Sequence, residues 1–335
     1  MSAFRWADGE RLIRFGPAVL DETPELLVEH GFDDYLLLTT ERALEQWPAL
    51  ENGADDVAYV PPGKVDEIAA ELLEKAGGRP LVGFGGGRVI DTAKAIAGST
   101  EDGRAAAVPT TLSGAPMTAY HRLPAGAEGA RFTRPQLVIA DPQLMASQSE
   151  PQLAASSMNA LAHATESLYT SLANPVSELA ALRAAALISS GLTGVEIDRP
   201  RLALAAILAG YAVGSTGVGV HHAVCQTIVR VSGSPHAETN AVMLPHFARL
   251  MAPRAPAALG ALAEALGDPV CEAGAAAALI ARLAARSGHT RLSTLGVEEG
   301  QLAEVADAVQ DHPGLEATPE PPARDDLLRL LQTAL

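Results

Sequence analysis

The sequence is poor in aromatic residues and in positive charge. Aromatic side chains make up 4% of the 335 residues, and the only lysines are Lys64, Lys75 and Lys94. Lysine and arginine together number 24 against 40 acidic residues, so the formal net charge is −16. A nucleic-acid-binding surface needs cations for phosphates and rings for bases. We therefore expect no nucleic-acid partner, although a local basic pocket for a small anionic substrate is compatible with an acidic surface.

Cysteine is also scarce, and no targeting or membrane segment is recognisable. Two cysteines, Cys225 and Cys271, cannot form a disulfide framework for a chain of this length, which indicates a reducing cytoplasmic environment. The first eight residues lack the apolar run that a signal peptide needs. The segment 202–229 contains no Lys, Arg, Asp or Glu, but its glycines, hydroxyl groups and histidines favour buried core helices over a membrane span.

The first half of the chain alternates between apolar strands and helices. A length of 335 residues with 48% apolar residues predicts about two domains with sizeable cores. We expect strands at 11–15, 35–40, 57–60, 80–84, 105–109 and 137–139, with helices at 21–30, 41–50, 65–76 and 88–97. Strands that alternate with helices are typical of βαβ units. Residues 1–150 are therefore predicted to form a doubly wound, Rossmann-like domain with a parallel sheet.

The second half is rich in Ala and Leu and has few β-branched runs, which predicts an all-helical domain over residues 151–335. Helices are expected at 153–169, 177–187, 202–213, 218–228, 237–251, 256–266, 271–285, 298–309 and 325–334. The proline-rich segment 313–324 is interpreted as a surface connection. The fold class is therefore α/β followed by all-α.

Three adjacent glycines, Gly85-Gly86-Gly87, follow a predicted strand and open a predicted helix. Glycines let backbone N–H groups approach an anion without an intervening Cβ, and a helix N-terminus adds partial positive charge. This context favours phosphate binding over a plain tight turn. Asp91 and Lys94 lie three residues apart on the same helix, where a surface ion pair is the plain alternative to a binding role.

The Gly-Gly-Gly-x-x-x-Asp-x-Ala-Lys run resembles that of the iron-containing (group III) alcohol dehydrogenases. The resemblance continues through four further runs in register, which are Val108–Gly114, Met158–Glu166, Gly219–Cys225 and Pro235–His246. Within the family, the maleylacetate reductase branch is the most similar. The resemblance implies a dehydroquinate synthase-like fold, an NAD(P)-dependent oxidoreductase of aromatic-compound catabolism, and a homodimer.

In that family the glycine loop and the following Pro-Thr-Thr-x-x-Ser-Gly loop bind NAD or NADP. The resemblance implies cofactor contacts by Gly85, Gly86, Gly87, Asp91, Lys94, Thr110, Thr111 and Ser113. Thr40, at the end of the second predicted strand, is expected to touch the adenosine ribose. The next residue, Glu41, favours NADH, whereas Arg42 would tolerate NADPH, so the preference stays open.

Metal-dependent members of the family bind Fe²⁺ or Zn²⁺ through one Asp and three His. The three histidines correspond to His163, His222 and His236, but Asn159 stands at the Asp position. A carboxamide offers a metal only a neutral oxygen. The maleylacetate reductase branch shares this Asn and is understood to work without metal. We therefore expect no catalytic metal; a metal that did bind would use these four residues.

Without a metal, an imidazolium is the expected proton donor, because the ordinary histidine pKa of about 6.5 lies near working pH. His236 or His222 is predicted to supply the proton, without a ranking between them, and His163 to orient the substrate. Asn159, Tyr120, Arg122 and Gln226 are predicted substrate contacts. Gln226 replaces a His of the relatives and Ala223 replaces a Lys of the branch. Both changes weaken the case for a dianionic substrate unless Arg122, or Arg131 and Arg134, compensate.

The predicted function is NAD(P)H-dependent reduction of a small carbonyl or unsaturated oxo-acid, similar to maleylacetate. One alternative is a metal-dependent alcohol dehydrogenase. A lyase of the dehydroquinate synthase type is a second alternative, although its basic phosphate-binding cluster is not visible among three lysines. A third alternative is a nucleotide-binding relative that has lost catalysis at Asn159 and Gln226.

Overall fold

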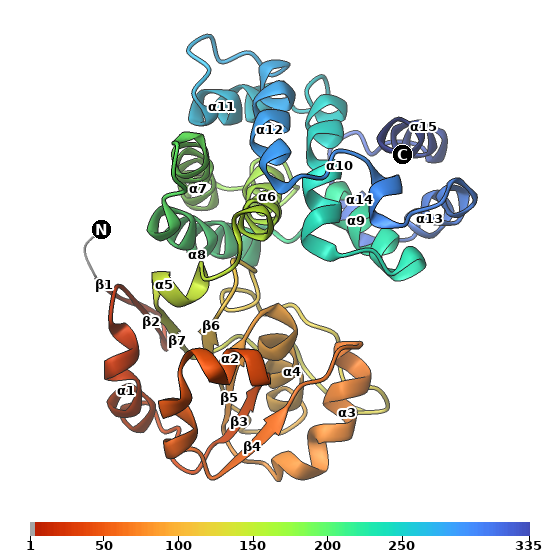
Figure 1. Cartoon of the computed structure of the whole chain (residues 1–335). Coiled ribbons are helices and arrows are strands. Elements are labelled where there is room, and N and C mark those ends of the chain that lie inside the picture. The colour runs from red at the N-terminus through yellow and green to blue at the C-terminus, as the bar shows by residue number, and fades with distance from the viewer. Residues whose placement is uncertain (1–3) are drawn as a thin grey trace. The chain divides into compact units, whose positions relative to one another are not determined.

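The chain forms two compact units (Figure 1). The computed structural model describes the backbone of residues 4–335 and side chains from Asp8 onward. The first unit ends at Ser147 and the second comprises Gln148–Leu335. The division lies three residues from the boundary predicted between residues 150 and 151.

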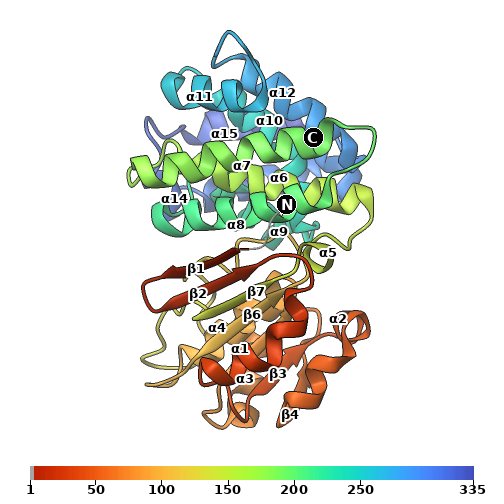
Figure 2. The ribbon, with the colours of Figure 1, turned by 90° about the vertical axis from the view of Figure 1, so that its left-hand side faces the viewer.

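A seven-stranded sheet forms the centre of the described first unit. Its first two strands pair antiparallel and all other neighbours pair parallel, as the βαβ pattern predicts (Figure 2). In spatial order the strands are β1 (Phe4–Asp8), β2 (Arg11–Phe15), β7 (Leu137–Ala140), β6 (Ala105–Pro109), β5 (Leu81–Gly85), β3 (Leu36–Thr39) and β4 (Asp56–Tyr59). β1 was not predicted; it joins β2 through a two-residue turn at Gly9, whose φ is 64°.

Helices cover both faces of this sheet because β3 is apolar on both sides. Leu37 packs in one core with α1 (Thr23–Glu29) and α2 (Glu41–Gln46). Leu36 and Leu38 point to the other core, with α3 (Val65–Ala76) and α4 (Gly87–Ala97). Continuous apolar strands of this kind are typical of parallel sheets that are buried on both faces. The prediction of a doubly wound domain is confirmed.

The strand order reverses between β3 and β5. From β3 the chain crosses by way of α2 to the edge strand β4, and it then returns by way of α3 to β5 on the other side of β3. Open α/β sheets bind ligands at the carboxyl ends of the strands at such a reversal. The Thr39 hydroxyl donates to the Phe84 carbonyl over 2.9 Å and ties the two strand ends together. Thr40 and the glycine loop therefore begin side by side.

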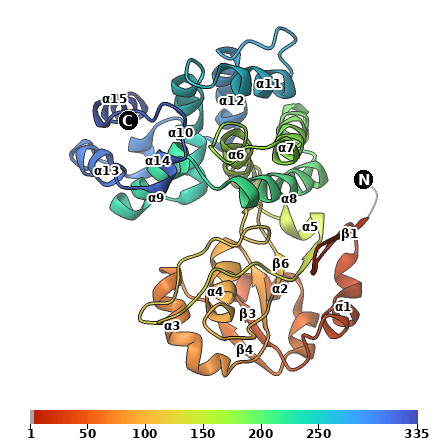
Figure 3. The ribbon, with the colours of Figure 1, turned by 180° about the vertical axis from the view of Figure 1, so that it is seen from behind.

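Every regular element in the described second unit is helical, as predicted. Helix α6 (Glu150–Ser167) is buried along most of its length and lies among α7, α8 and α10 (Figure 3). A helix enclosed in this way needs no polar face. The other α-helices of this unit are α7 (Pro175–Thr193), α8 (Arg199–Thr216), α9 (Val220–Ser232), α10 (His236–Met251), α11 (Pro256–Leu266), α12 (Ala275–Ala284), α13 (Leu302–Ala308), α14 (Pro313–Glu316) and α15 (Arg324–Ala334).

The uncharged segment 202–229 lies in α8 and α9, whose apolar side chains are largely buried. The chain bends by 102° between these helices, next to Gly217, whose φ is 69°. Among the described residues no single helix meets the length and hydropathy criteria for a membrane span, and α8 with α9 meets them only as a bent pair. Two buried helices were predicted for this segment, and the structure has them.

Candidate functional site

The glycine loop packs tightly against the loop that follows β6. None of its three glycines has a positive φ, so close approach is the reason for glycine here. A Cβ at Gly85 would lie 2.8 Å from Val89 Cγ2, and one at Gly87 would lie 3.1 Å from Ser113 Oγ. Both distances are too short for a side chain to be accommodated without movement. The glycines thus bring the N-terminus of α4 against Ser113 and its neighbours.

This junction holds unsatisfied donors that suit a phosphate. No side chain of the described structure caps the N-terminus of α4, an 11-residue helix. The buried Ser113 hydroxyl has no hydrogen-bond partner among the described residues. The Thr110 N–H donates to the Gly85 carbonyl over 2.9 Å and holds the two loops together, and Thr111 lies beside Gly86. A helix N-terminus with a free hydroxyl beside it fits a pyrophosphate group.

Thr40 and its neighbours lie at the start of α2. The Thr40 hydroxyl accepts a hydrogen bond from the Ala43 N–H at 3.2 Å and so caps this helix. A threonine in this role stabilises the helix by about 1 kcal/mol whether or not it also contacts a ribose. Glu41 and Arg42, the residues on which the cofactor preference depends, are both exposed.

Lys94 is fully buried, with 0% of its side chain exposed, so the alternative of a surface ion pair is wrong for it. Its ammonium group donates to Asp91 Oδ1 at 2.7 Å and to the carbonyl oxygens of Tyr120 and Ala115 at 2.8 and 3.1 Å. The Thr118 hydroxyl lies farther away, at 3.4 Å, so the three shorter bonds satisfy the three hydrogens of the group. Lys94 therefore fastens the segment 115–120 to α4, and the pKa of Lys94 is lowered by burial.

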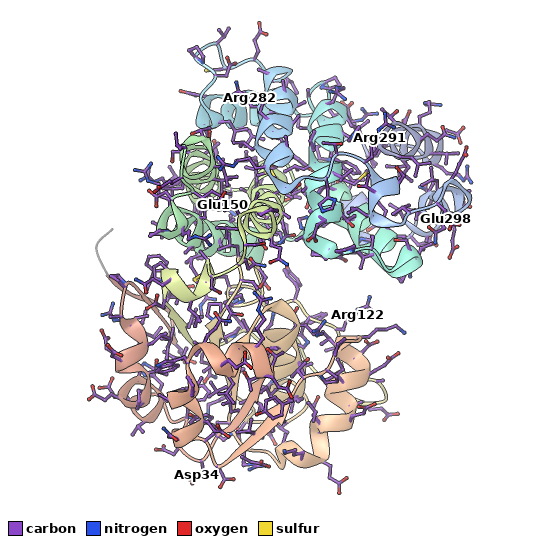
Figure 4. All side chains as sticks on the ribbon, in the orientation of Figure 1. Asp34, Arg122, Glu150, Arg282, Arg291 and Glu298 are labelled. Atoms are coloured by element: carbon purple, nitrogen blue, oxygen red, sulfur yellow. The ribbon has the colours of Figure 1, made fainter. Side chains whose placement is uncertain are left out.

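The predicted substrate contacts of the first unit lie on its surface. Tyr120 is 47% exposed and packs edge-on against Phe132. Arg122, labelled in Figure 4, is 57% exposed. Its Nη1 lies 3.9 Å from Asp66 Oδ2 of α3. An exposed pair at that distance is weakly held, so the guanidinium is available for other partners.

Three helices of the second unit bring the predicted polar residues together. Asn159 and His163 lie one turn apart on α6, His222 lies in the first turn of α9, and His236 begins α10. The rings of His163 and His222 stack, with centroids 4.4 Å apart and planes 6° from parallel. His222 Nε2 lies 3.3 Å from Asn159 Oδ1, and the His222 and His236 centroids are 6.5 Å apart. Gln226 is exposed on the following turn of α9.

Glu166 belongs to this cluster, although the sequence analysis did not select it. Its side chain is 0% exposed, and its Oε2 lies 2.5 Å from His222 Nδ1. Its Oε1 accepts a hydrogen bond from the His222 backbone N–H at 3.2 Å. The signal was present in the sequence, since Glu166 lies three residues after His163 and seven after Asn159, on the same face of one helix.

The first turn of α9 depends on side chains from elsewhere in the second unit. A Cβ at Gly219 would lie 3.0 Å from Glu166 Oε1 and 3.1 Å from Thr318 Oγ1, which explains the glycine. The Thr318 hydroxyl accepts from the Val220 N–H at 2.9 Å and donates to the Gly314 carbonyl at 2.8 Å. The prediction of a surface connection over 313–324 is therefore wrong for Thr318 and for Leu315, which are buried. Thr318 is buried because it caps α9.

A second network holds His236. The Asn240 side-chain N–H2 lies 3.3 Å from His236 Nε2 and donates to the His236 carbonyl at 2.8 Å. Asn240 Oδ1 accepts a hydrogen bond from Nε2 of the buried His221 at 2.8 Å. The His236 side chain itself is exposed. The two neighbouring histidines of α9 thus serve different partners, with His222 bound to Glu166 and His221 bound to Asn240.

Comparison with known proteins agrees with this architecture. The profile of the iron-containing alcohol dehydrogenases matches residues 11–142, and the C-terminal profile of the Fe-containing alcohol dehydrogenase family matches residues 153–335. The chain belongs to the iron-containing alcohol dehydrogenase family. It is an NAD(P)-dependent oxidoreductase, and its relatives place it in the maleylacetate reductase branch, as the sequence motifs predicted.

Several members of this family named for one activity align along nearly the whole chain. Maleylacetate reductase 2 of Cupriavidus pinatubonensis is 36% identical over 96% of this chain and 93% of that protein. Maleylacetate reductase 1 of Rhodococcus opacus is 31% identical over 99% and 96%. The crystal structure of maleylacetate reductase from a Rhizobium species has a TM-score of 0.84 at 27% identity, over 100% of this chain and 98% of that one.

The family's usual metal does not fit the residues present. Asn159 and the three histidines are all neutral ligands, and the nearby carboxylate of Glu166 is bound to His222. Nitrogen lone pairs lie in the ring plane, so the parallel rings of His163 and His222 cannot both point at one cation. No group of three or more His, Cys, Asp or Glu side chains in the described part of the chain is arranged to hold a metal ion.

Burial suppresses protonation in this cluster. It lowers the pKa of His222 to about 3, with a smaller effect from the nearby His236. Burial and, next, the neighbouring His222 also lower the pKa of His221 to about 3, and the pKa of His163 falls well below its ordinary range for the same two reasons. The prediction of an imidazolium donor with an ordinary pKa therefore does not suit His222, one of the two predicted donors.

Proposed function

We propose that this protein reduces a small unsaturated or carbonyl oxo-acid of the maleylacetate type with NADH or NADPH, and that it does so without a metal ion. The observation that carries the proposal is the contact between Asn159 and His222, which puts a neutral hydrogen-bonding pair where metal-dependent relatives need an anionic ligand. The named activity of the relatives along nearly the whole chain supports the substrate class.

The first unit is proposed to hold the cofactor. The donors are the N-terminus of α4 behind Gly85, Gly86 and Gly87 and the hydroxyl groups of Thr110, Thr111 and Ser113. Thr40 lies at the neighbouring strand end, where the ribose is expected. Asp91 and Lys94 form an ion pair on α4. Lys94 also donates to the carbonyl oxygens of Ala115 and Tyr120, and through these bonds the pair supports the loop after β6. When bound, the nicotinamide supplies a hydride.

The second unit is proposed to supply the proton. Addition of a hydride to a ketone carbon, or to the C=C bond conjugated with it, leaves the electron pair on the carbonyl oxygen as an alkoxide or enolate. His236 is the proposed proton donor because its ring is exposed, so that solvent restores its proton after each turnover. His163, whose buried Nδ1 has no partner among the described residues, is proposed to bind the substrate together with Asn159. Arg122, Tyr120 and Gln226 remain proposed substrate contacts.

The setting of the reaction is also a proposal. Both cysteines are free, and Cys271 is exposed, which supports a reducing cytoplasmic location. A homodimer is proposed from the family resemblance, and light scattering of the purified protein would measure it. A monomer at all concentrations would contradict this point.

The test is oxidation of NADH and of NADPH by the purified protein with maleylacetate, with simple ketones and aldehydes compared in parallel. We expect turnover with the oxo-acid in preference to the uncharged carbonyls. His236→Asn should lower kcat about 10²- to 10⁴-fold, the range for loss of a general acid. His246→Asn changes another histidine on α10 and should leave kcat unchanged. Equal kcat in both variants would refute the assignment of His236, and cofactor binding without turnover on any carbonyl would refute the function.

A further inference from the structure

The buried carboxylate of Glu166 has no role in the reaction as proposed so far. It reaches from α6 to the N-terminus of α9, where its two oxygens are used differently. Oε2 lies 2.5 Å from His222 Nδ1, while Oε1 accepts from the His222 backbone N–H. The backbone N–H groups of Gly219 and His221 are also near enough to this carboxylate to lower its pKa. Glu166 thus touches both the helix end and the ring of His222.

Burial raises the pKa of the Glu166 carboxyl group, and the groups around its two oxygens oppose this effect. The His222 N–H donates to Glu166, the N–H groups of Gly219 and His221 lower its pKa, and the N-terminus of the 13-residue helix α9 adds partial positive charge. An ionised carboxylate can only accept hydrogen bonds. With Glu166 ionised, the ring nitrogen 2.5 Å from Oε2 carries the hydrogen, which selects one of the two neutral forms of His222.

We propose that Glu166 is a positioning residue for the reaction, because it holds the His222 ring with hydrogen on Nδ1 and directs the lone pair of Nε2 at Asn159. The atom of Asn159 that lies 3.3 Å from Nε2 in the structure is Oδ1. A half-turn of the amide about χ2 exchanges its oxygen and nitrogen, so that the NH₂ group donates to Nε2. Its carbonyl oxygen is turned away from His222 and remains available to a ligand. An Asp at position 159 would set lone pairs against the lone pair of Nε2, so Asn is the residue that suits this ring.

Glu166 also caps α9, so a test must separate capping from positioning. In Glu166→Gln the amide oxygen still accepts from the backbone N–H groups, but the new NH₂ group donates to His222 Nδ1. The hydrogen of His222 must then move to Nε2, which turns the Asn159 contact around. Thr318→Val is the matched control, since it removes the cap of Val220 in the same helix turn without touching His222.

The kinetic arm rests on the proposed function. Glu166→Gln should keep the Tm of the wild type while kcat falls about 100-fold, the low end for an acid–base network. Thr318→Val should show the opposite, with Tm lower by about 2–4 °C after loss of a helix cap and kcat unchanged. Wild-type kcat in Glu166→Gln would overturn the proposal, as would an equal loss of kcat in the control.

The spectroscopic arm does not depend on the substrate. Two-bond ¹H–¹⁵N spectra of protein labelled with ¹⁵N-histidine distinguish the two neutral forms of a ring, and His222→Gln identifies the signal. We expect hydrogen on Nδ1 of His222 in the wild type and on Nε2 in Glu166→Gln. Hydrogen on Nε2 in the wild type would refute the proposal. If no oxo-acid is turned over, the proposed function fails, while these spectra still decide the role of Glu166.

Discussion

Lys94 in the first unit and Glu166 in the second are both fully buried charges, yet they are compensated in different ways. Lys94 donates to two backbone carbonyls and, at 3.4 Å, to the Thr118 hydroxyl of one loop, and it also donates to Asp91. Glu166 divides its oxygens between the end of a helix and the ring of His222. Burial of a charged group costs much less free energy when its hydrogen bonds are satisfied. The partners differ here, so that Lys94 holds a loop in place, whereas Glu166 orients the ring of a candidate catalytic residue.

This difference predicts which part of the protein is disturbed when each residue is substituted. Loss of the Lys94 bonds should disturb the segment 115–120 and, through it, the cofactor loop, while the histidine cluster stays intact. Loss of the Glu166 contact should alter His222 while the cofactor loop stays intact. The following experiments sharpen this contrast between the units.

Acid should weaken the second unit first. Burial lowers the folded-state pKa of His221 and His222 to about 3, so the unfolded chain binds more protons than the folded one between about pH 6.5 and pH 3. Their stabilisation is complete above about pH 6.5 and is lost as pH falls, at about 1.4 kcal/mol per pH unit each. The buried His163, whose pKa also falls well below its ordinary range, adds to this loss, and Glu166, whose pKa burial raises, opposes it, so the folded second unit loses stability as pH falls from about 6.5.

The two units can be followed separately in this experiment. Both tryptophans, Trp6 and Trp47, belong to the first unit, so their fluorescence reports on it, whereas far-UV circular dichroism reports mainly on the helical second unit. Urea unfolding at about pH 7 and about pH 5 should show a fall in the free energy of unfolding by circular dichroism and a smaller change by fluorescence. The same free energy of unfolding at both pH values would contradict the account.

Lys94→Met should weaken cofactor binding and spare the chemistry. It keeps the apolar stem but leaves the Tyr120 and Ala115 carbonyls without their donor, which costs about 1–3 kcal/mol of stability. We expect a weaker Kd for NADH by about tenfold, equivalent to about 1.4 kcal/mol, with kcat at saturating cofactor nearly unchanged. Isothermal titration and steady-state kinetics measure the two effects. A large fall in kcat with unchanged Kd would show that Lys94 acts on the reaction itself.

Arg122→Ala should have the smallest effect on stability. The guanidinium is exposed and 3.9 Å from Asp66, so the free energy of unfolding should change by less than about 0.5 kcal/mol. If Arg122 binds a substrate carboxylate as proposed, KM for the oxo-acid should rise while kcat and Tm stay the same. An unchanged KM would remove Arg122 from the substrate contacts.

Local sequence patterns predicted most of the fold. The ranges of α3, β6 and α11 agree with the predictions to the residue, because amphipathic spacing and flanking Gly or Pro define them. Strand β1 was missed although Asp8-Gly9 is a hairpin signal. The burial of Thr318 could not be predicted, since it depends on a bond to Val220, 98 residues away in the sequence.

The candidate site was predicted as a set of residues, but without its chemistry. Motifs brought Asn159 together with His163, His222 and His236, and these residues cluster in the structure. The low pKa of His222 and its bond to Glu166 arise from tertiary burial, which spacing along one helix does not reveal. For the same reason, the sequence could not show that Lys94 donates hydrogen bonds to the backbone of the segment 115–120.

The most direct test of the account measures metal content and activity on one sample. Elemental analysis of the purified protein is paired with NADH and NADPH oxidation on maleylacetate, with and without a chelator. The account predicts turnover by protein that carries far less than one metal ion per chain, and no change on chelation. Stoichiometric zinc or iron, with activity lost on chelation and restored by the metal, would contradict it and make the protein a metal-dependent dehydrogenase despite Asn159.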